Sequence, residues 1–152
     1  MKKIFVNEEW CLGCHLCEYN CAFANSTDKE PKYLENDIAK VLKDKKINPN
    51  IKIDDDGKIC FAVSCRHCFD PQCVKACING VWTKNADGTV TMDKERCVGC
   101  QTCIVACPYG CIVLNDDHTA VKKCELCMNN VIGEPMCVKG CPNNAIIFEE
   151  EA

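Results

Sequence analysis

The sequence predicts an α+β fold in which short strands alternate with single helical turns, and two observations support this prediction. The first is the presence of 18 cysteines in 152 residues, most of them grouped in four quartets. The second is a series of short β-branched runs that flank turns rich in Asn, Asp and Gly. In a chain of this kind the cysteines stabilise the fold, either as disulfides or as ligands of zinc or iron-sulfur clusters.

The four quartets repeat along the chain with related spacing. In every quartet two residues separate the first pair of cysteines and three residues separate the last pair. The quartets are Cys11, Cys14, Cys17 and Cys21, then Cys65, Cys68, Cys73 and Cys77, then Cys97, Cys100, Cys103 and Cys107, and finally Cys124, Cys127, Cys137 and Cys141. The first and third have the spacing of bacterial ferredoxins, whereas the second and fourth have longer middle gaps.

This spacing indicates [4Fe-4S] clusters. Three cysteines in one loop can wrap a corner of the cube while a distant fourth closes the site. Zinc sites usually use two separated pairs, and disulfides between such closely spaced cysteines would be strained. We therefore predict that sixteen cysteines ligate four [4Fe-4S] clusters. A zinc-stabilised interaction module is the alternative from another functional class.

The strands and helices follow in order along the chain. Residues 3–6 and 145–148 are predicted to form short terminal strands. Residues 81–83 and 89–92 form a predicted hairpin around an Asp-Gly turn, and residues 112–114 and 119–121 form another. Residues 24–54 contain no cysteine, and their apolar positions at helical spacing predict an inserted amphipathic helix and loop. We expect this insertion to pack against the cluster-binding part, and a dedicated docking role is the alternative.

Cys60 and Cys111 are left over when the four quartets are complete. We interpret Cys60 as a free thiol and Cys111 as a small packing residue. An alternative uses Cys60 with Cys65 and Cys68 as a plant-type [2Fe-2S] run, with Cys97 downstream. That assignment would remove a ligand from the third quartet.

Other residues lie beside the predicted ligands. Gly13 and Gly99 are expected to let the backbone approach a cluster, because they have no side chain. Four basic residues beside ligands could raise the reduction potentials of individual clusters, but we expect them to be ordinary solvated surface charges. They are Arg66, Lys75, Lys122 and Lys123.

Charge and composition exclude several functional classes. The formal charge is −4, and sixteen thiolates would make it more negative, which suits docking on basic patches of redox proteins and does not suit nucleic acid. The sequence contains neither a secretion signal nor an apolar run long enough for a membrane span, so a cytoplasmic protein with no direct membrane insertion is expected. Since His15, His67 and His118 are not needed as ligands and there is no catalytic constellation, we predict an electron carrier and not an enzyme.

The quartet order and spacing resemble the four-cluster iron-sulfur subunits of the dimethyl sulfoxide reductase and formate dehydrogenase type, across nearly the whole chain. The resemblance implies two ferredoxin-like 2[4Fe-4S] modules related by a pseudo-two-fold axis. Residues 1–23 plus 113–152 would form the outer module, 24–54 the insertion, and 55–112 an inner module inserted in the outer one. Ala22 and Ile78 stand where a proline could follow the fourth cysteine.

The resemblance also implies which cysteines share a cluster, because in two-cluster ferredoxins the fourth cysteine of a run binds the other cluster. With the family's pairing of quartets, the expected ligand sets are Cys11, Cys14, Cys17 and Cys141 for cluster 1, Cys65, Cys68, Cys73 and Cys107 for cluster 2, Cys97, Cys100, Cys103 and Cys77 for cluster 3, and Cys124, Cys127, Cys137 and Cys21 for cluster 4.

Residues 10–26 are similar to the ferredoxin-like subunit associated with carbon monoxide dehydrogenase. This similarity implies that the protein passes electrons from that enzyme to a hydrogenase or a flavin oxidoreductase in an anaerobe. The alternative within the same class is an electron-transfer subunit of a formate dehydrogenase or hydrogenase complex.

Overall fold

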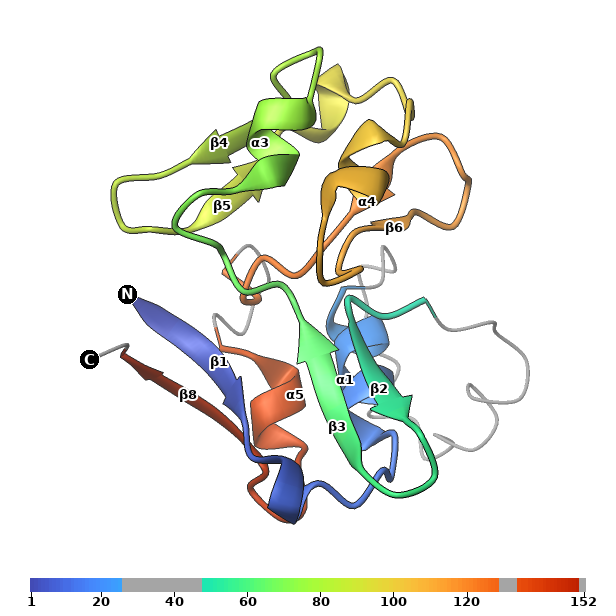
Figure 1. Cartoon of the computed structure of the whole chain (residues 1–152), viewed down its shortest axis with the longest axis vertical. Coiled ribbons are helices and arrows are strands. Elements are labelled where there is room, and N and C mark those ends of the chain that lie inside the picture. The colour runs from blue at the N-terminus through green and yellow to red at the C-terminus, as the bar shows by residue number, and fades with distance from the viewer. Residues whose placement is uncertain (26–47, 129–133, 151–152) are drawn as a thin grey trace.

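The computed structural model describes residues 1–25, 48–128 and 134–150. They form short strands, short α-helices and two 3-10 turns (Figure 1). The elements are β1 (Lys2–Val6), η1 (Glu8–Trp10), α1 (Leu16–Ala24), β2 (Ile51–Asp55), β3 (Cys60–Ser64), α3 (Gln72–Ala76), β4 (Trp82–Lys84), β5 (Val90–Met92), η3 (Lys94–Arg96), α4 (Thr102–Ala106), β6 (Val113–Leu114), β7 (Val121–Lys122), α5 (Met136–Lys139) and β8 (Ile146–Glu150). The predicted mixture of short strands and helical turns is confirmed.

The described strands form antiparallel pairs. β1 pairs with β8, with Ile4 opposite Phe148, and this pair joins the two ends of the described chain. β4 pairs with β5 and β6 with β7, which confirms both predicted hairpins. The pairing of distant ends places residues from the beginning and end of the sequence side by side (Figure 1).

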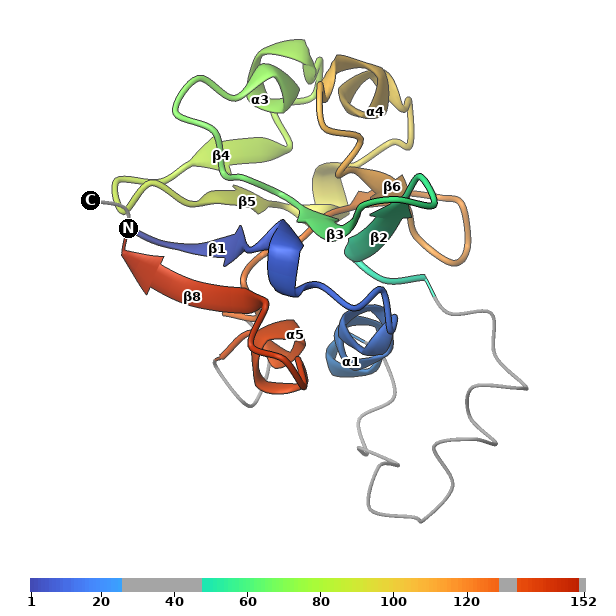
Figure 2. The ribbon, with the colours of Figure 1, turned by 60° about the horizontal axis from the view of Figure 1, so that its bottom comes forward.

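Two hydrophobic cores lie in different parts of the molecule. In Figure 2 the elements α1, α5 and β8, which contribute to the first core, lie at the bottom, and α4 and β4, which contribute to the second, lie at the top. The first core contains the buried residues Cys17, Cys21, Ile51, Ala62, Cys137 and Ile146. The second contains Val81, Trp82, Val90, Cys103, Ile112 and Val121. Predicted cluster ligands are therefore part of both cores, and the first core combines residues from the two ends of the chain.

The pair β2 and β3 was not among the predicted strands. Ile51 lies opposite Ser64, and Asp55 opposite Cys60. Of the predicted inserted helix and loop at 24–54, residues 26–47 lie outside the described residues, and residues 51–54 are strand and not loop. The pair belongs to the first core because Ile51, only 1% exposed, packs there with Ala62.

The sequence did contain a signal for this hairpin. Apolar Ile51 and Ile53 alternate with Lys52, which is the pattern of a half-buried strand. Gly57, with φ of +83°, follows Asp56 in the turn, as Gly88 follows Asp87 in the hairpin that was predicted. Among the residues that the structure describes, no helix is long and apolar enough to cross a membrane.

Candidate metal centres

Four hollows in the protein are each lined by four cysteines of the predicted ligand sets, three from one run and the fourth from another. Their volumes, which include space open to solvent, are about 290 to 380 Å³. Cavity 1 has Cys11, Cys14, Cys17 and Cys141, cavity 2 has Cys65, Cys68, Cys73 and Cys107, cavity 3 has Cys97, Cys100, Cys103 and Cys77, and cavity 4 has Cys124, Cys127, Cys137 and Cys21. The structure thus gathers each expected set around one hollow, and iron ligation by these residues stays a prediction.

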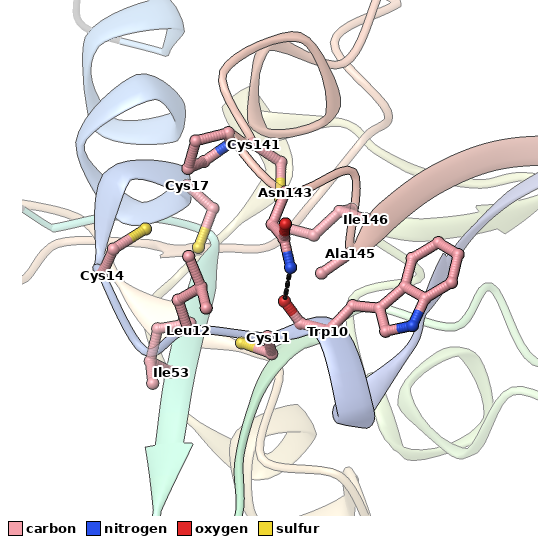
Figure 3. A pocket seen from close by; sticks show the side chains of 11 residues that line it. Trp10, Cys11, Leu12, Cys14, Cys17, Ile53, Cys141, Asn143, Ala145 and Ile146 are labelled. Carbon is pink, nitrogen blue, oxygen red and sulfur yellow. Dashed lines mark hydrogen bonds between the residues drawn. The ribbon is translucent and has the colours of Figure 1, made fainter.

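Cavity 1 illustrates how distant segments meet (Figure 3). Cys11 precedes α1, Cys17 lies in its first turn, and Cys141 follows α5. The side-chain amide of Asn143 donates to the carbonyl oxygen of Trp10 at 2.8 Å. This hydrogen bond holds the segment after Cys141 against the segment before Cys11, so that both cysteines line the same cavity.

The backbone turns that position these cysteines are left-handed. His15 before α1 and Gln101 before α4 have φ of +61° and +64°, a conformation that turns the chain sharply from a loop into a helix. As a result, the third cysteine of each run, Cys17 or Cys103, enters the helix and is buried.

Packing within the protein gives a structural reason for Gly13 and Gly99. Their φ values, +62° and +67°, are strained for residues with a side chain. An added Cβ would lie 3.1 Å from the sulfur of Cys60 at the first position and 2.5 Å from the carbonyl oxygen of Thr119 at the second. These contacts favour glycine at both positions, and the expected approach of the backbone to a cluster stays a prediction.

Backbone amides donate to several cysteine sulfurs. Asn50 donates to Cys21 at 3.3 Å, and Val81 donates to Cys77 at the same distance. His67 and Leu126 make similar bonds to the first cysteines of their runs, at 3.5 and 3.4 Å. Hydrogen bonds of this kind stabilise thiolates and influence the reduction potential of a bound cluster.

Burial makes these cysteines weak acids on their own. It raises the pKa of the Cys17 and Cys124 thiols to about 12 and that of Cys73 to about 11. Burial also raises the pKa of Cys137, and nearby cysteines add to the effect. These thiols are protonated at neutral pH unless positive metal ions stabilise the thiolates, so ligand binding and proton release are coupled.

Buried polar atoms without a hydrogen-bond partner lie on residues that line the cavities. Among the described residues they are Asn50 Oδ1, His67 Nε2 and Trp82 Nε1, which belong to the walls of cavities 4, 2 and 3. An unpaired buried N–H is costly, and the sulfur atoms of a cluster are acceptors. The N–H groups of His67 in cavity 2 and Trp82 in cavity 3 therefore fit the acceptor sulfurs of an iron-sulfur group, whereas the Asn50 oxygen is an acceptor and gives no such support in cavity 4.

The His67 ring is held in one orientation. The backbone N–H of Val90 donates to its Nδ1 at 2.9 Å. Burial, followed by the positive charge of Lys123, lowers the pKa of His67 to about 3. The neutral ring consequently carries its proton on Nε2, the atom without a protein partner.

The two remaining cysteines occupy different positions. Cys60 lines none of the four cavities and its thiol donates to the carbonyl oxygen of Cys11 at 3.3 Å. Cys111 lines cavity 2 as a fifth cysteine, and its thiol donates to the carbonyl oxygen of Tyr109 at 3.4 Å. Burial raises the pKa of Cys111 to about 12. Their predicted role as non-ligands stays a prediction.

The four basic residues beside the ligands differ in exposure. Lys75 forms an exposed ion pair with Asp70 at 2.6 Å, as expected for a surface charge. Arg66 lies over the ring of Tyr109, 4.5 Å from its centroid. Lys122 is partly buried and donates to the carbonyl oxygen of Asn48. The expectation is wrong for Lys123, which is only 3% exposed.

No group of three or more His, Cys, Asp or Glu side chains within residues 1–25, 48–128 and 134–150 is arranged to hold a single metal ion. A [4Fe-4S] cube presents a separate iron to each thiolate, so its four ligands surround a core and do not meet at one ion. His15 and His118 are exposed, and His15 pairs with Glu18 at 2.7 Å.

Comparison with known proteins decides the family. The profile of the 4Fe-4S dicluster domain matches residues 58–151, which is more than half of the chain. The chain belongs to this dicluster family. Membership supports [4Fe-4S] clusters as the group for which the cysteines are arranged.

Several dicluster relatives are known in Escherichia coli K12. The chain is 32% identical over 147 residues to the B subunit of the anaerobic dimethyl sulfoxide reductase, covering 95% of this chain and 71% of that protein. It is 34% identical over 148 residues to the iron-sulfur subunit of the nitrate-inducible formate dehydrogenase, covering 91% of this chain and 50% of that subunit. The predicted resemblance to these two types of subunit is confirmed.

A longer relative contains a similar stretch. The putative oxidoreductase AegA of the same organism is 32% identical over 150 residues, covering 94% of this chain. The chain spans only 21% of the length of AegA. The association with carbon monoxide dehydrogenase stays a prediction.

Proposed function

We propose that the chain holds four [4Fe-4S] clusters, one in each of cavities 1 to 4, and carries electrons between a redox enzyme and an acceptor. The observation that supports this function best is the gathering of four cysteines around each of four hollows of similar size. A bound cluster of this type supplies reversible one-electron chemistry. In this proposal the chain itself is not an enzyme, and its residues bind, orient and shield the clusters.

Two modules with a pseudo-two-fold relation are part of the proposal. Ligands of cavities 1 and 4 pack into the first core, and ligands of cavities 2 and 3 pack into the second. The local structure also repeats: Asn7 caps η1 before the first run, and Asp93 caps η3 before the third run in the same way. Both side chains accept from the backbone N–H two residues later.

The boundary between the modules is adjusted in this proposal. The expected division placed residues 1–23 and 113–152 in the outer module and 55–112 in the inner one. Because β2 and β3 pair with each other and Ile51 and Ala62 pack in the first core, we assign both strands to the outer module. Because Leu114 of β6 and Val121 of β7 pack in the second core, the inner module then extends from near Cys65 to the end of β7.

Carbon monoxide dehydrogenase is the proposed electron donor, with a hydrogenase or a flavin oxidoreductase as the acceptor, in the cytoplasm. This part rests on the similarity of residues 10–26 to the ferredoxin-like subunit associated with that enzyme. The same residues contribute Trp10, Cys11 and Leu12 to the wall of cavity 1. Leu12 is 66% exposed there, so a partner could reach the edge of this cavity.

A formate dehydrogenase or hydrogenase complex is the second candidate partner, and the identity to the formate dehydrogenase iron-sulfur subunit favours it. The two candidates are separated by mixing the purified protein with each enzyme and its substrate under anaerobic conditions. Bleaching of the visible cluster absorbance by carbon monoxide dehydrogenase and carbon monoxide is the expected result. Efficient bleaching only by formate dehydrogenase and formate would replace the proposed partner with the second candidate.

A further inference from the structure

Lys123 lies along the chain between the second core and cavity 4. Val121, two residues before it, belongs to the second core, and Cys124, which follows it, lines cavity 4. Its side chain also lines cavity 2. A single lysine thus contacts the wall of one cavity and immediately precedes a cysteine of another.

The Lys123 ammonium is held in place by backbone groups. Its Nζ donates to the carbonyl oxygen of Val90 at 2.6 Å and to that of Cys124 at 2.9 Å. It also lies 5.6 Å from the centroid of the Trp82 ring. Since Val90 donates its N–H to His67, one residue of β5 fixes both Lys123 and the neutral histidine of cavity 2.

This buried charge needs a negative partner. Lys123 is 3% exposed, and none of the ion pairs between described residues includes it. A buried unpaired ammonium is costly, so buried charges are normally paired. A cluster in cavity 2, whose wall includes Lys123, and a cluster bound by Cys124, the next residue along the chain, would each bring negative thiolates to this buried ammonium.

From this geometry we infer that Lys123 is a counter-charge shared by clusters 2 and 4, and that it raises the reduction potential of both. The inference rests on the proposed function. A positive charge favours the more negative, reduced state of a nearby cluster, and it does so strongly where water is excluded. Lys123 contacts no substrate and acts through its charge on the two clusters. Ligands of cluster 2 belong to the second core and ligands of cluster 4 to the first.

The test measures the potential of each cluster in the Lys123→Met holoprotein by redox titration followed by electron paramagnetic resonance. Signals are assigned with cysteine variants of each cavity. We expect the reduction equilibria of clusters 2 and 4 to shift at least tenfold toward the oxidised state, or about 59 mV for a one-electron couple. Clusters 1 and 3 should change less.

Lys75→Met is the matched control. Lys75 also lies two residues from a predicted ligand, Cys73, but it is exposed and paired with Asp70. Solvent screens such a charge, so this variant should keep all four potentials. Equal shifts in the two variants would show that burial at Lys123 has no special role and would overturn the inference.

Two further variants keep the test decisive if the neutral substitution at Lys123 causes the protein to lose clusters. Lys123→Gln keeps a donor for the two carbonyl groups without the charge and should lower the same two potentials, whereas Lys123→Arg keeps the charge and should preserve them. If only the neutral variants lose iron from cavities 2 and 4, the charge holds these clusters as inferred. Unchanged potentials in a fully loaded neutral variant, or equal iron loss in Lys123→Arg, contradict the inference. A wild-type protein without iron would instead refute the proposed function.

Discussion

At the scale of single residues, the fourth cysteine of each run decides how the cavities are closed. Cys137 lies in α5 and lines cavity 4, whereas Cys141, just after the same helix, lines cavity 1. One helical turn therefore separates a residue of one site from a residue of its neighbour. The general rule of crossed ligation and the family resemblance were both needed to expect this, because spacing alone cannot pair the quartets.

Replacing Cys141 by alanine is predicted to damage the cluster held by the N-terminal loop. The cluster at Cys124, Cys127 and Cys137 should stay largely intact, because Cys141 lines only cavity 1. The signal lost from the spectrum should match the one lost in Cys14→Ala. If it matches that of Cys124→Ala, each run binds its own cluster and the crossed arrangement is wrong.

Serine at Cys60 or at Cys111 is predicted to leave the iron content unchanged. Four other cysteines line every cavity, and the Cys60 thiol faces the carbonyl oxygen of Cys11 and not a cavity. Iron per chain, measured beside the wild type, checks both variants. A loss of one cluster's iron in Cys60→Ser would favour the plant-type alternative, and the same loss in Cys111→Ser would make the fifth cysteine of cavity 2 a ligand.

At the scale of elements, the two hairpins with a clear turn signal could be predicted. Of the helix and loop expected at 24–54, residues 26–47 lie outside the described residues and residues 51–54 form a strand. The Asp-Gly turn before β5 is adjacent to β-branched residues on both sides, so local sequence specifies it. The pair β2 and β3 was missed because the long cysteine-free segment was interpreted as a unit. This strand pair is buried by contacts with distant cysteines, since Ile51 packs in the first core with Cys17 and Cys137. Local sequence carries no information on such long-range contacts.

Ile51→Ala is predicted to lower the free energy of unfolding by about 2–5 kcal/mol, because it removes a fully buried side chain from the first core. Urea unfolding of the anaerobic holoprotein, followed by cluster absorbance, measures the change. Ile59→Ala is the matched control, since Ile59 lies in the turn of the same hairpin and is 53% exposed. Its expected effect is within about 0.5 kcal/mol. Equal effects would mean that β2 does not contribute to the core as described.

At the scale of the whole molecule, cysteines replace part of an ordinary apolar core. Cys17, Cys21 and Cys137 are buried in the first core and Cys103 in the second. The number of quartets and the compact α+β architecture could be read from the sequence. The burial of Lys123 could not, because a lysine beside a ligand is usually solvated, and only the meeting of β5 with the segment after β7 encloses it.

Removing iron with a chelator is predicted to unfold most of the chain, because thiolate ligation and folding are coupled. Loss of the far-ultraviolet circular dichroism signal, together with loss of visible absorbance, is the expected result. An apoprotein that keeps its secondary structure and unfolds cooperatively would contradict the view that clusters complete the two cores.

The most direct test of the central claim is the iron, sulfide and zinc content of the protein purified under anaerobic conditions. Four cubane clusters predict about sixteen iron atoms and about sixteen sulfides per chain and a brown colour. About half of these amounts would support only one pair of clusters. A colourless protein that contains zinc and little iron would contradict the account.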